Sequence, residues 1–189
     1  MAYSEVQICN DALAMLGQSP IISLNDQARP AGLCKTFYPL RRDEVLRAHP
    51  WRFAVRRTDL AANTTAPAWK YTYAYDLPVD CLRVLDVERR YAADDWQVEG
   101  RQIATNLGDP LNIAYIAKVT DPGQYDAGFV SALSARLAWA LAMPITASPT
   151  MAQEMERAFK AAMREARGVS AREGKPQTVY ADEFLESRF

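Results

Sequence analysis

The stretch from Tyr125 to Met143 constrains the fold most, because its last seventeen residues carry one charged side chain, Arg136. Four large apolar side chains recur every four positions, at Phe129, Leu133, Leu137 and Leu141, and Trp139 adds one further bulky side chain. A helix that is apolar nearly all round must be covered on most sides. With Arg136 near its middle it is too short for a membrane span, which needs about 20 consecutive apolar residues. We therefore predict the central core helix of a soluble domain, over about residues 124–143, and expect Pro144 to end it.

A first helix is predicted over about residues 3–17. Ser4 and Gln7 have the spacing of a capping box, in which each side chain bonds the backbone N–H of the other residue. Apolar residues then recur at helical spacing, and Gly17 can adopt the left-handed conformation that closes a helix.

A second helix is predicted over about residues 26–48, with Asp26 as its N-cap. One side of it carries Leu33, Phe37 and Leu40, with Cys34 and Tyr38 beside them. Pro39 removes a backbone donor, so we expect a kink or a break there. The helix should stop before His49-Pro50, because a residue ahead of proline is pushed out of the α region.

The chain from about residue 53 to residue 120 changes to a period of two with strong β formers, which predicts a small β lobe. The candidate strands are Phe53–Leu60, Tyr71–Asp76, Leu82–Val87, Trp96–Val98, Arg101–Ala104 and Ile113–Val119. Glu99-Gly100 is a candidate hairpin turn. The connections are too short for helical crossovers, so the strands should be mostly antiparallel. Two helices, a β lobe and further helices make an α+β fold: about four helices in a bundle, with the lobe inserted between the second and third.

The last helix is predicted over about residues 149–168, with Ser148 as N-cap and Pro149 at its first position. Four basic residues spaced three or four apart share one of its faces: Arg157, Lys160, Arg164 and Arg167. Nearby glutamates offset much of this charge. The basic stripe is therefore either a solvated helix face or a contact for phosphates or for an acidic partner.

The chain has 189 residues and a net charge of −1, so no global excess of charge suggests a nucleic-acid binder. The charge is uneven, however, because eight basic residues between Arg29 and Arg57 face only Asp43 and Glu44. The part of this region from Arg41 to Arg57 supports the main alternative function, a soluble α+β protein that binds nucleic acid. It lacks the interleaved exposed aromatic residues that binding to single strands would need.

No arrangement of residues points to catalysis. His49 is the sole histidine, and no nucleophile elbow, glycine-rich phosphate loop or Cys/His metal spacing occurs. Cys9, Cys34 and Cys81 lie far apart in apolar segments, which is typical of buried free thiols. We predict no catalytic residue, no metal site and no cofactor. No basic and apolar signal precedes Ser4, so we expect synthesis in a reducing cytoplasm.

The C-terminal tail, residues 169–189, is mostly polar but contains four large apolar residues: Tyr180, Phe184, Leu185 and Phe189. Terminal segments stay disordered unless something holds them. These side chains either bind a partner surface or fold back on their own domain, and the sequence leaves both alternatives open.

Five segments, in this order, resemble the tail tubular protein A family of tailed phages, which are head-to-tail adaptors best known from short-tailed phages. They are ICNDALAMLG at Ile8–Gly17, FYPLRRDEVLRAHPWRFAVRRTDLA at Phe37–Ala61, YAYDLPVDCLRVLDV at Tyr73–Val87, VEGRQIATN at Val98–Asn106 and YIAKVTDPGQYDAGFVSALSARLAWALAMPIT at Tyr115–Thr146. The most specific run is LRAHPWRF, from Leu46 to Phe53. The resemblance covers roughly residues 1–168, one adaptor domain, and does not extend to the tail.

The resemblance implies a structural virion protein without catalysis. Family members form a ring, typically a dodecamer, that docks beneath the portal at the head-tail junction, contacts the tail nozzle, and lets the double-stranded genome pass through its channel. The tail would then bind the portal through Tyr180, Phe184, Leu185 and Phe189. The basic stripe of Arg157, Lys160, Arg164 and Arg167 would line the channel or a subunit interface. No membrane and no cofactor are implied.

Overall fold

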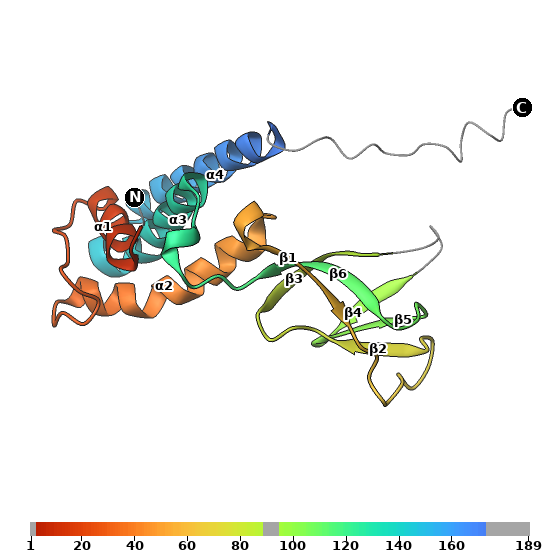
Figure 1. The fold of residues 1–189 in the computed structure, drawn as a ribbon. Helices are drawn as coiled ribbons and strands as arrows, with labels where there is room; N and C mark the ends of the chain where they lie inside the picture. The colour runs from red at the N-terminus through yellow and green to blue at the C-terminus, as the bar shows by residue number, and fades with distance from the viewer. Residues whose placement is uncertain (1–2, 89–94, 173–189) are drawn as a thin grey trace, which may run out of the picture.

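Within residues 3–88 and 95–172, which the computed structural model describes, the chain has four α-helices and two three-stranded sheets (Figure 1). The helices are α1 (Glu5–Met15), α2 (Arg29–Ala48), α3 (Ala127–Thr146) and α4 (Pro149–Arg172). The strands are β1 (Val55–Leu60), β2 (Tyr73–Asp76), β3 (Cys81–Val87), β4 (Trp96–Glu99), β5 (Gln102–Thr105) and β6 (Leu111–Ala117). This confirms the predicted α+β class, with the strands between the second and third helices.

α1 begins as predicted. The Ser4 hydroxyl accepts a hydrogen bond from the Gln7 N–H at 3.2 Å, and the Ser4 N–H donates to Oε1 of Gln7 at 2.9 Å, which completes the capping box. Gly17 follows the helix with a φ of +67°. Glycine adopts this left-handed conformation at little steric cost.

α2 begins later than predicted, and the assignment of Asp26 as its N-cap was wrong. The Asp26 carboxylate instead accepts hydrogen bonds from the backbone N–H groups of Ile22 and Ser23, both at 3.0 Å, within the loop before the helix. The expected break at Pro39 does not occur, since α2 runs through it as one element. Pro39 and Lys35, one turn earlier, are both exposed, so the carbonyl that loses its partner lies on the solvent side. The predicted end before His49 is confirmed.

The buried face of α2 also differs from the prediction. Leu40, expected among its apolar residues, is 58% exposed, and Leu33 and Phe37 are only half-buried. The residues that face the core are Ala31, Cys34, Tyr38, Val45 and Leu46, together with Arg42. Compared with the prediction, α2 is therefore rotated about its axis, so that the side with Cys34 and Tyr38 faces the core and the side with Leu40 faces solvent.

α3 is the core helix of the protein and contacts the other three helices. Asp126 caps it, because its carboxylate accepts a hydrogen bond from the Phe129 N–H at 2.6 Å. The prediction that Pro144 ends α3 was wrong: the helix continues to Thr146 and closes at Ala147, whose φ is +51° and whose N–H donates to the Met143 carbonyl at 3.1 Å. A proline in the last turn of a helix removes one backbone N–H donor, but the hydrogen bonds donated by the residues after it can still form.

The prediction that this helix is too short for a membrane span was wrong, because by length and hydropathy alone α3 could cross a membrane. However, 61% of its most apolar window is buried inside the protein. Leu133, Leu137 and Leu141 have no exposed surface. The burial of α3 fits the core helix expected from the sequence.

The six strands form two separate sheets, with strand orders β1-β6-β3 and β2-β5-β4, and all pairs are antiparallel as predicted. The predicted hairpin turn is confirmed, since Glu99 pairs with Gln102 and Gly100 has a φ of +61°. The first strand starts two residues later than expected, because a 3-10 turn occupies Arg52–Ala54. The division into two sheets was not predicted.

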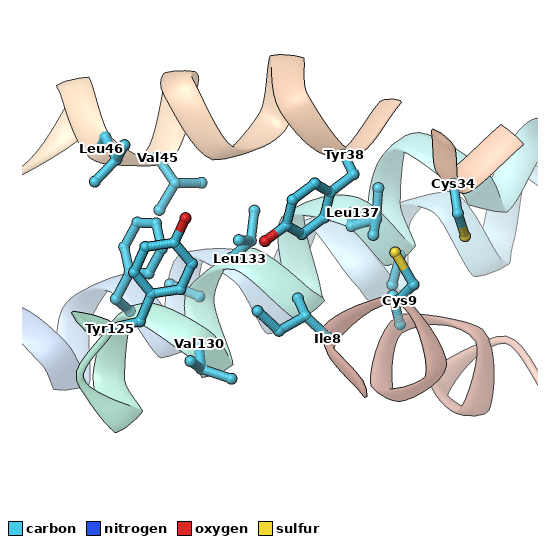
Figure 2. Packing of buried hydrophobic residues seen from close by; sticks show 14 of the residues in the cluster. Ile8, Cys9, Cys34, Tyr38, Val45, Leu46, Tyr125, Val130, Leu133 and Leu137 are labelled. Atoms are coloured by element: carbon cyan, nitrogen blue, oxygen red, sulfur yellow. The ribbon is translucent and has the colours of Figure 1, made fainter. Parts of the chain in front are cut away.

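The helical part and the β part each have a hydrophobic core. The larger one lies among the helices, where side chains of α3 meet those of α1 and α2 (Figure 2). The smaller one lies between the sheets and contains Tyr75, Ile103 and Tyr115. Cys9, Cys34 and Cys81 are buried and free, as predicted.

An aromatic joint, formed by Trp51, Phe53, Tyr125 and Phe129, connects the helices to the sheets. The ring of Phe129 meets Trp51 edge-on at 5.1 Å and Phe53 at 5.2 Å between centroids. The indole N–H of Trp51 donates to the Val45 carbonyl at 2.8 Å, which ties the joint to α2. Such aromatic pairs add to the stability that burial alone supplies.

Candidate functional site

The basic stripe predicted on the last helix lies on the exposed side of α4. Arg157, Lys160, Arg164 and Arg167 are all exposed. The opposite side of α4 packs on α3 so closely that a Cβ added at Gly128 would lie 3.3 Å from Cβ of Ala166. The stripe therefore points away from the core.

A groove of about 400 Å³ lies between the C-terminal end of α2 and α4. Its lining residues are Ala48, Phe159, Lys160, Met163, Arg164 and Arg167. We call it the basic groove. Three of the four stripe residues line it, and the fourth, Arg157, does not. Its apolar lining comes from Phe159 and Met163 of α4 and from Ala48 of α2, so an occupant would meet positive charge beside an apolar floor.

The positive charge of the basic groove is only partly neutralised within the chain. Nζ of Lys160 pairs with Oε1 of Glu156 at 2.6 Å. Arg164 and Arg167 make no ion pair within residues 3–88 and 95–172. Two guanidinium groups one turn apart are therefore available to an anionic group.

The pKa of His49, which follows the groove residue Ala48, is affected by the positive charge of the groove. The His49 side chain is 9% exposed, and its Nε2 is buried without a hydrogen-bond partner in the described part of the chain. Burial lowers the pKa of His49 below its usual value, and the charges of Arg167 and Arg83 lower it further. The His49 ring packs edge-on against the Trp51 ring, with 4.8 Å between their centroids.

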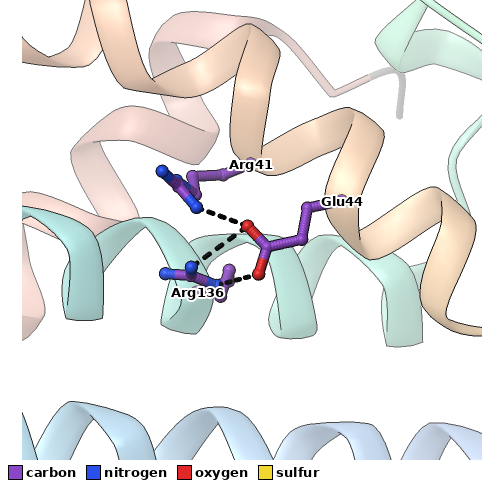
Figure 3. A network of polar contacts seen from close by, with 3 residues as sticks. All are labelled: Arg41, Glu44 and Arg136. Atoms are coloured by element: carbon purple, nitrogen blue, oxygen red, sulfur yellow. Dashed lines mark hydrogen bonds and ion pairs between the residues drawn. The ribbon is translucent and has the colours of Figure 1, made fainter.

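An ion pair joins α2 to α3 (Figure 3). Nε and Nη2 of Arg136 donate to Glu44 at 2.8 and 3.0 Å, and Arg41 binds the same carboxylate. Burial opposes ionisation of Glu44, but the hydrogen bonds and charges of Arg136 and Arg41 outweigh it and hold its pKa below the usual value. The Arg136 guanidinium lies over Trp139 at 4.4 Å and toward the groove residue Phe159 at 5.9 Å. The central arginine is thus a structural residue.

The basic region from Arg41 to Arg57 is largely occupied by contacts inside the chain. Arg42 is 5% exposed and pairs with Asp43 at 2.8 Å. Arg47 donates to the Leu82 carbonyl at 2.7 Å, and Arg56 donates to the Phe53 carbonyl at 2.8 Å. These guanidinium groups hold the α2 end and the first strand in place, which leaves fewer of them for phosphates than the sequence suggests.

A second surface feature lies on the sheet β2-β5-β4. A hollow of about 1000 Å³ is bounded by the loop over residues 62–71 and by one face of that sheet, which presents Asp76, Glu99 and Gln102. Trp69 at its rim is 79% exposed, and Val79 in the turn before β3 is 97% exposed. The sequence carries no signal for this hollow, because the hollow depends on how the loop lies against the sheet.

No group of three or more His, Cys, Asp or Glu residues that could hold a metal ion occurs in the described residues. Neither a family model nor a curated protein matches this sequence. The site must therefore be judged on its own geometry.

The four tail residues predicted to bind the portal, Tyr180, Phe184, Leu185 and Phe189, lie outside the described residues. α4 extends to Arg172, four residues past the predicted boundary of the domain. Of the two sets of candidate residues, only the basic stripe has a described structure.

Proposed function

We propose that this chain is a head-to-tail adaptor of a tailed phage, similar to the tail tubular protein A family. Copies of it form a ring, in the family typically a dodecamer, beneath the portal at the head-tail junction of the virion. The ring joins the portal to the tail nozzle and lets double-stranded DNA pass. It carries out no catalysis and needs no cofactor.

The observation that carries this proposal is a body with two different ends. The four helices lie at one end and the two sheets at the other (Figure 1). The run from Leu46 to Phe53, the most specific part of the resemblance, supplies Trp51 and Phe53 to the aromatic joint. A subunit that connects two unlike partners needs two unlike surfaces. At the β end, Trp69 and Val79 are exposed large apolar residues.

The charge distribution also supports a conduit rather than a tight DNA binder. The net charge is −1, and much of the Arg41 to Arg57 region is occupied within the chain. Each neutralised phosphate adds to salt-dependent affinity. DNA has to slide through a channel, so an adaptor should contact few phosphates firmly.

Electron microscopy of the purified chain mixed with the portal protein of the same genome tests the proposal. We expect symmetric rings that add a layer to the portal only when this chain is present. A chain truncated after Arg172 should keep its helical content and lose portal docking if the tail is the portal contact. Portal rings that stay unchanged with the full chain would overturn the adaptor assignment.

The nucleic-acid alternative makes the opposite prediction for the isolated chain. A labelled DNA duplex should bind only weakly at physiological salt if the chain is an adaptor. Tight binding that falls steeply with salt, and that charge removal at Arg41 or Arg57 abolishes, would favour the alternative function.

A further inference from the structure

The lining of the basic groove favours an occupant of a particular chemistry. Arg164 and Arg167 present two guanidinium groups without ion pairs among the described residues, and Lys160 lies one turn before Arg164. Phe159 and Met163 contribute an apolar floor, and Ala48 at the end of α2 adds an apolar contact. A matching occupant carries carboxylates next to large apolar side chains.

The sequence that follows α4 contains such a segment. Asp182 and Glu183 directly precede Phe184 and Leu185, and Glu186 directly follows them. Three carboxylates thus flank two large apolar side chains within five residues. Residues 173–181 contain no comparable cluster, because Glu173 and Lys175 are its charged residues.

The length of chain after α4 allows this segment to reach the groove of its own molecule. Ten residues lead from Arg172 to Asp182, and an extended chain of that length spans up to about 33 Å. Arg164 lies eight residues before Arg172 on the same helix, a distance of about 12 Å along its axis. The chain is therefore long enough to turn after α4 and run back antiparallel to it as far as the groove. A tethered segment also has an effective local concentration in the millimolar range, which favours its own groove over that of another copy.

We propose that the segment from Asp182 to Glu186 docks in the basic groove of its own chain. Its carboxylates meet Arg164, Arg167 and Lys160, and Phe184 and Leu185 cover the apolar floor. The contact belongs to the isolated chain and does not depend on the adaptor function. If the tail also binds a portal, it must first leave this groove.

Zero-length cross-linking of the full chain with a water-soluble carbodiimide tests the contact directly. The reagent joins a lysine amine to a carboxylate that lies against it, and peptide mass spectrometry then locates the new amide. We expect an amide from Lys160 to Asp182, Glu183 or Glu186. The Lys160–Glu156 amide within α4 serves as an internal standard, because that pair is 2.6 Å apart. Formation of the standard without any tail amide would overturn the proposal.

Charge removal distinguishes the groove from general electrostatic attraction without adding a carboxylate beside Lys160. Arg164→Gln should lower the yield of the tail amide, relative to the standard, by up to about fivefold, which is the range for an exposed ion pair. Arg157→Gln is the matched control: it makes the same change on the same exposed face of α4 but outside the groove, and should leave the yield unchanged. An equal loss in both variants would show a diffuse charge effect and reject the docking site.

Mixing unlabelled and ¹⁵N-labelled chains before cross-linking identifies the source of the tail. Docking within one chain gives amides between peptides of the same isotope only. Amides between labelled and unlabelled peptides would assign the groove to the tail of a second copy and overturn the same-chain proposal.

Discussion

The helical part of this protein has a much larger hydrophobic core than the β part. In the helical part, α3 is covered by three helices, and a single core extends from Ile8 to Ala166. In the β part, two three-stranded sheets share a small core, and each sheet leaves two strand edges unpaired within the described residues. The comparison indicates that the helical part holds most of the stability, while the β part provides surface. Regions with fewer buried contacts open locally at lower cost.

The two parts are nevertheless tied together at several points. Besides the aromatic joint, Arg47 of α2 donates to the Leu82 carbonyl of β3, and Lys118 after β6 pairs with Asp43 of α2 at 2.9 Å. Loss of the helical core should therefore unfold both parts, whereas a defect in the sheets should remain local.

The largest effect is expected from Leu133→Ala, at a fully buried position of α3. Truncating a buried leucine removes apolar burial and leaves a cavity, so the free energy of unfolding should fall by about 3–5 kcal/mol. Urea denaturation followed by circular dichroism measures it. Met143→Ala, in the same helix but 49% exposed, should change stability by less than about 0.5 kcal/mol. Equal losses from the two variants would contradict a core centred on α3.

Glu44→Ala should have the next largest effect. It leaves the Arg136 guanidinium, whose side chain is 11% exposed, without its carboxylate. Because Glu44 itself is 43% exposed, we expect about 1–3 kcal/mol rather than the full cost of breaking a buried pair. Thermal denaturation of Arg41→Ala, which removes only the more exposed partner, should show a loss below about 1 kcal/mol. A larger loss for Arg41→Ala than for Glu44→Ala would reverse the assigned roles.

In the β part, Tyr75→Phe should cost about 0.5–1.5 kcal/mol, because the Tyr75 hydroxyl donates to the Leu107 carbonyl at 2.9 Å. Hydrogen exchange should speed up in β2, β4 and β5 and stay unchanged in α1 and α3. Tyr73→Phe is the control, since the Tyr73 hydroxyl makes no hydrogen bond among the described residues. Faster exchange throughout the helices would show that the two parts open together.

The smallest effect concerns the pH dependence of stability. The pKa of His49 is lowered from 6.5 in the folded protein by burial, Arg167 and Arg83, against a weaker opposite effect of Asp126. The unfolded chain therefore binds a proton first, so the contribution of His49 is fully present above pH 6.5 and is lost as pH falls through the folded pKa. One proton changes the free energy of unfolding by at most about 1.4 kcal/mol per pH unit. Because His49 is the sole histidine, His49→Gln should flatten the stability profile between pH 7 and 5. A slope that persists in the variant would assign it to other groups.

The elements of this fold could be predicted from the sequence where the deciding interactions join residues that are close together in the chain. The capping box at Ser4 and Gln7 and the turn at Glu99-Gly100 each involve residues within four positions of one another. The alternation around Tyr73 predicted a strand for the same reason. Even so, local rules were wrong at Asp26 and Pro144. The Asp26 carboxylate accepts a hydrogen bond from the Ile22 N–H in the loop instead of capping α2. Past Pro144, α3 continues and closes with the hydrogen bond from the Ala147 N–H to the Met143 carbonyl.

For the candidate site, the sequence located the basic stripe but not the groove. Helical spacing is enough to put Lys160, Arg164 and Arg167 on one face of α4. The groove also needs Ala48 from α2, more than a hundred residues away in the chain. The i,i+4 spacing of Glu156 and Lys160 indicates the one ion pair of the stripe. That Arg164 and Arg167 make none among the described residues depends on which acidic groups of other segments lie nearby in space.

By itself the sequence determined the order, type and approximate length of the helices and strands, because periodicity, capping and turn chemistry act over a few residues. The tertiary structure decided that β1 pairs with β6, that the strands divide into two sheets, and that Arg136 binds a carboxylate 92 residues away. It also decided which face of α2 is buried. These features depend on contacts between distant segments, whose relative positions are set by packing the whole chain around α3.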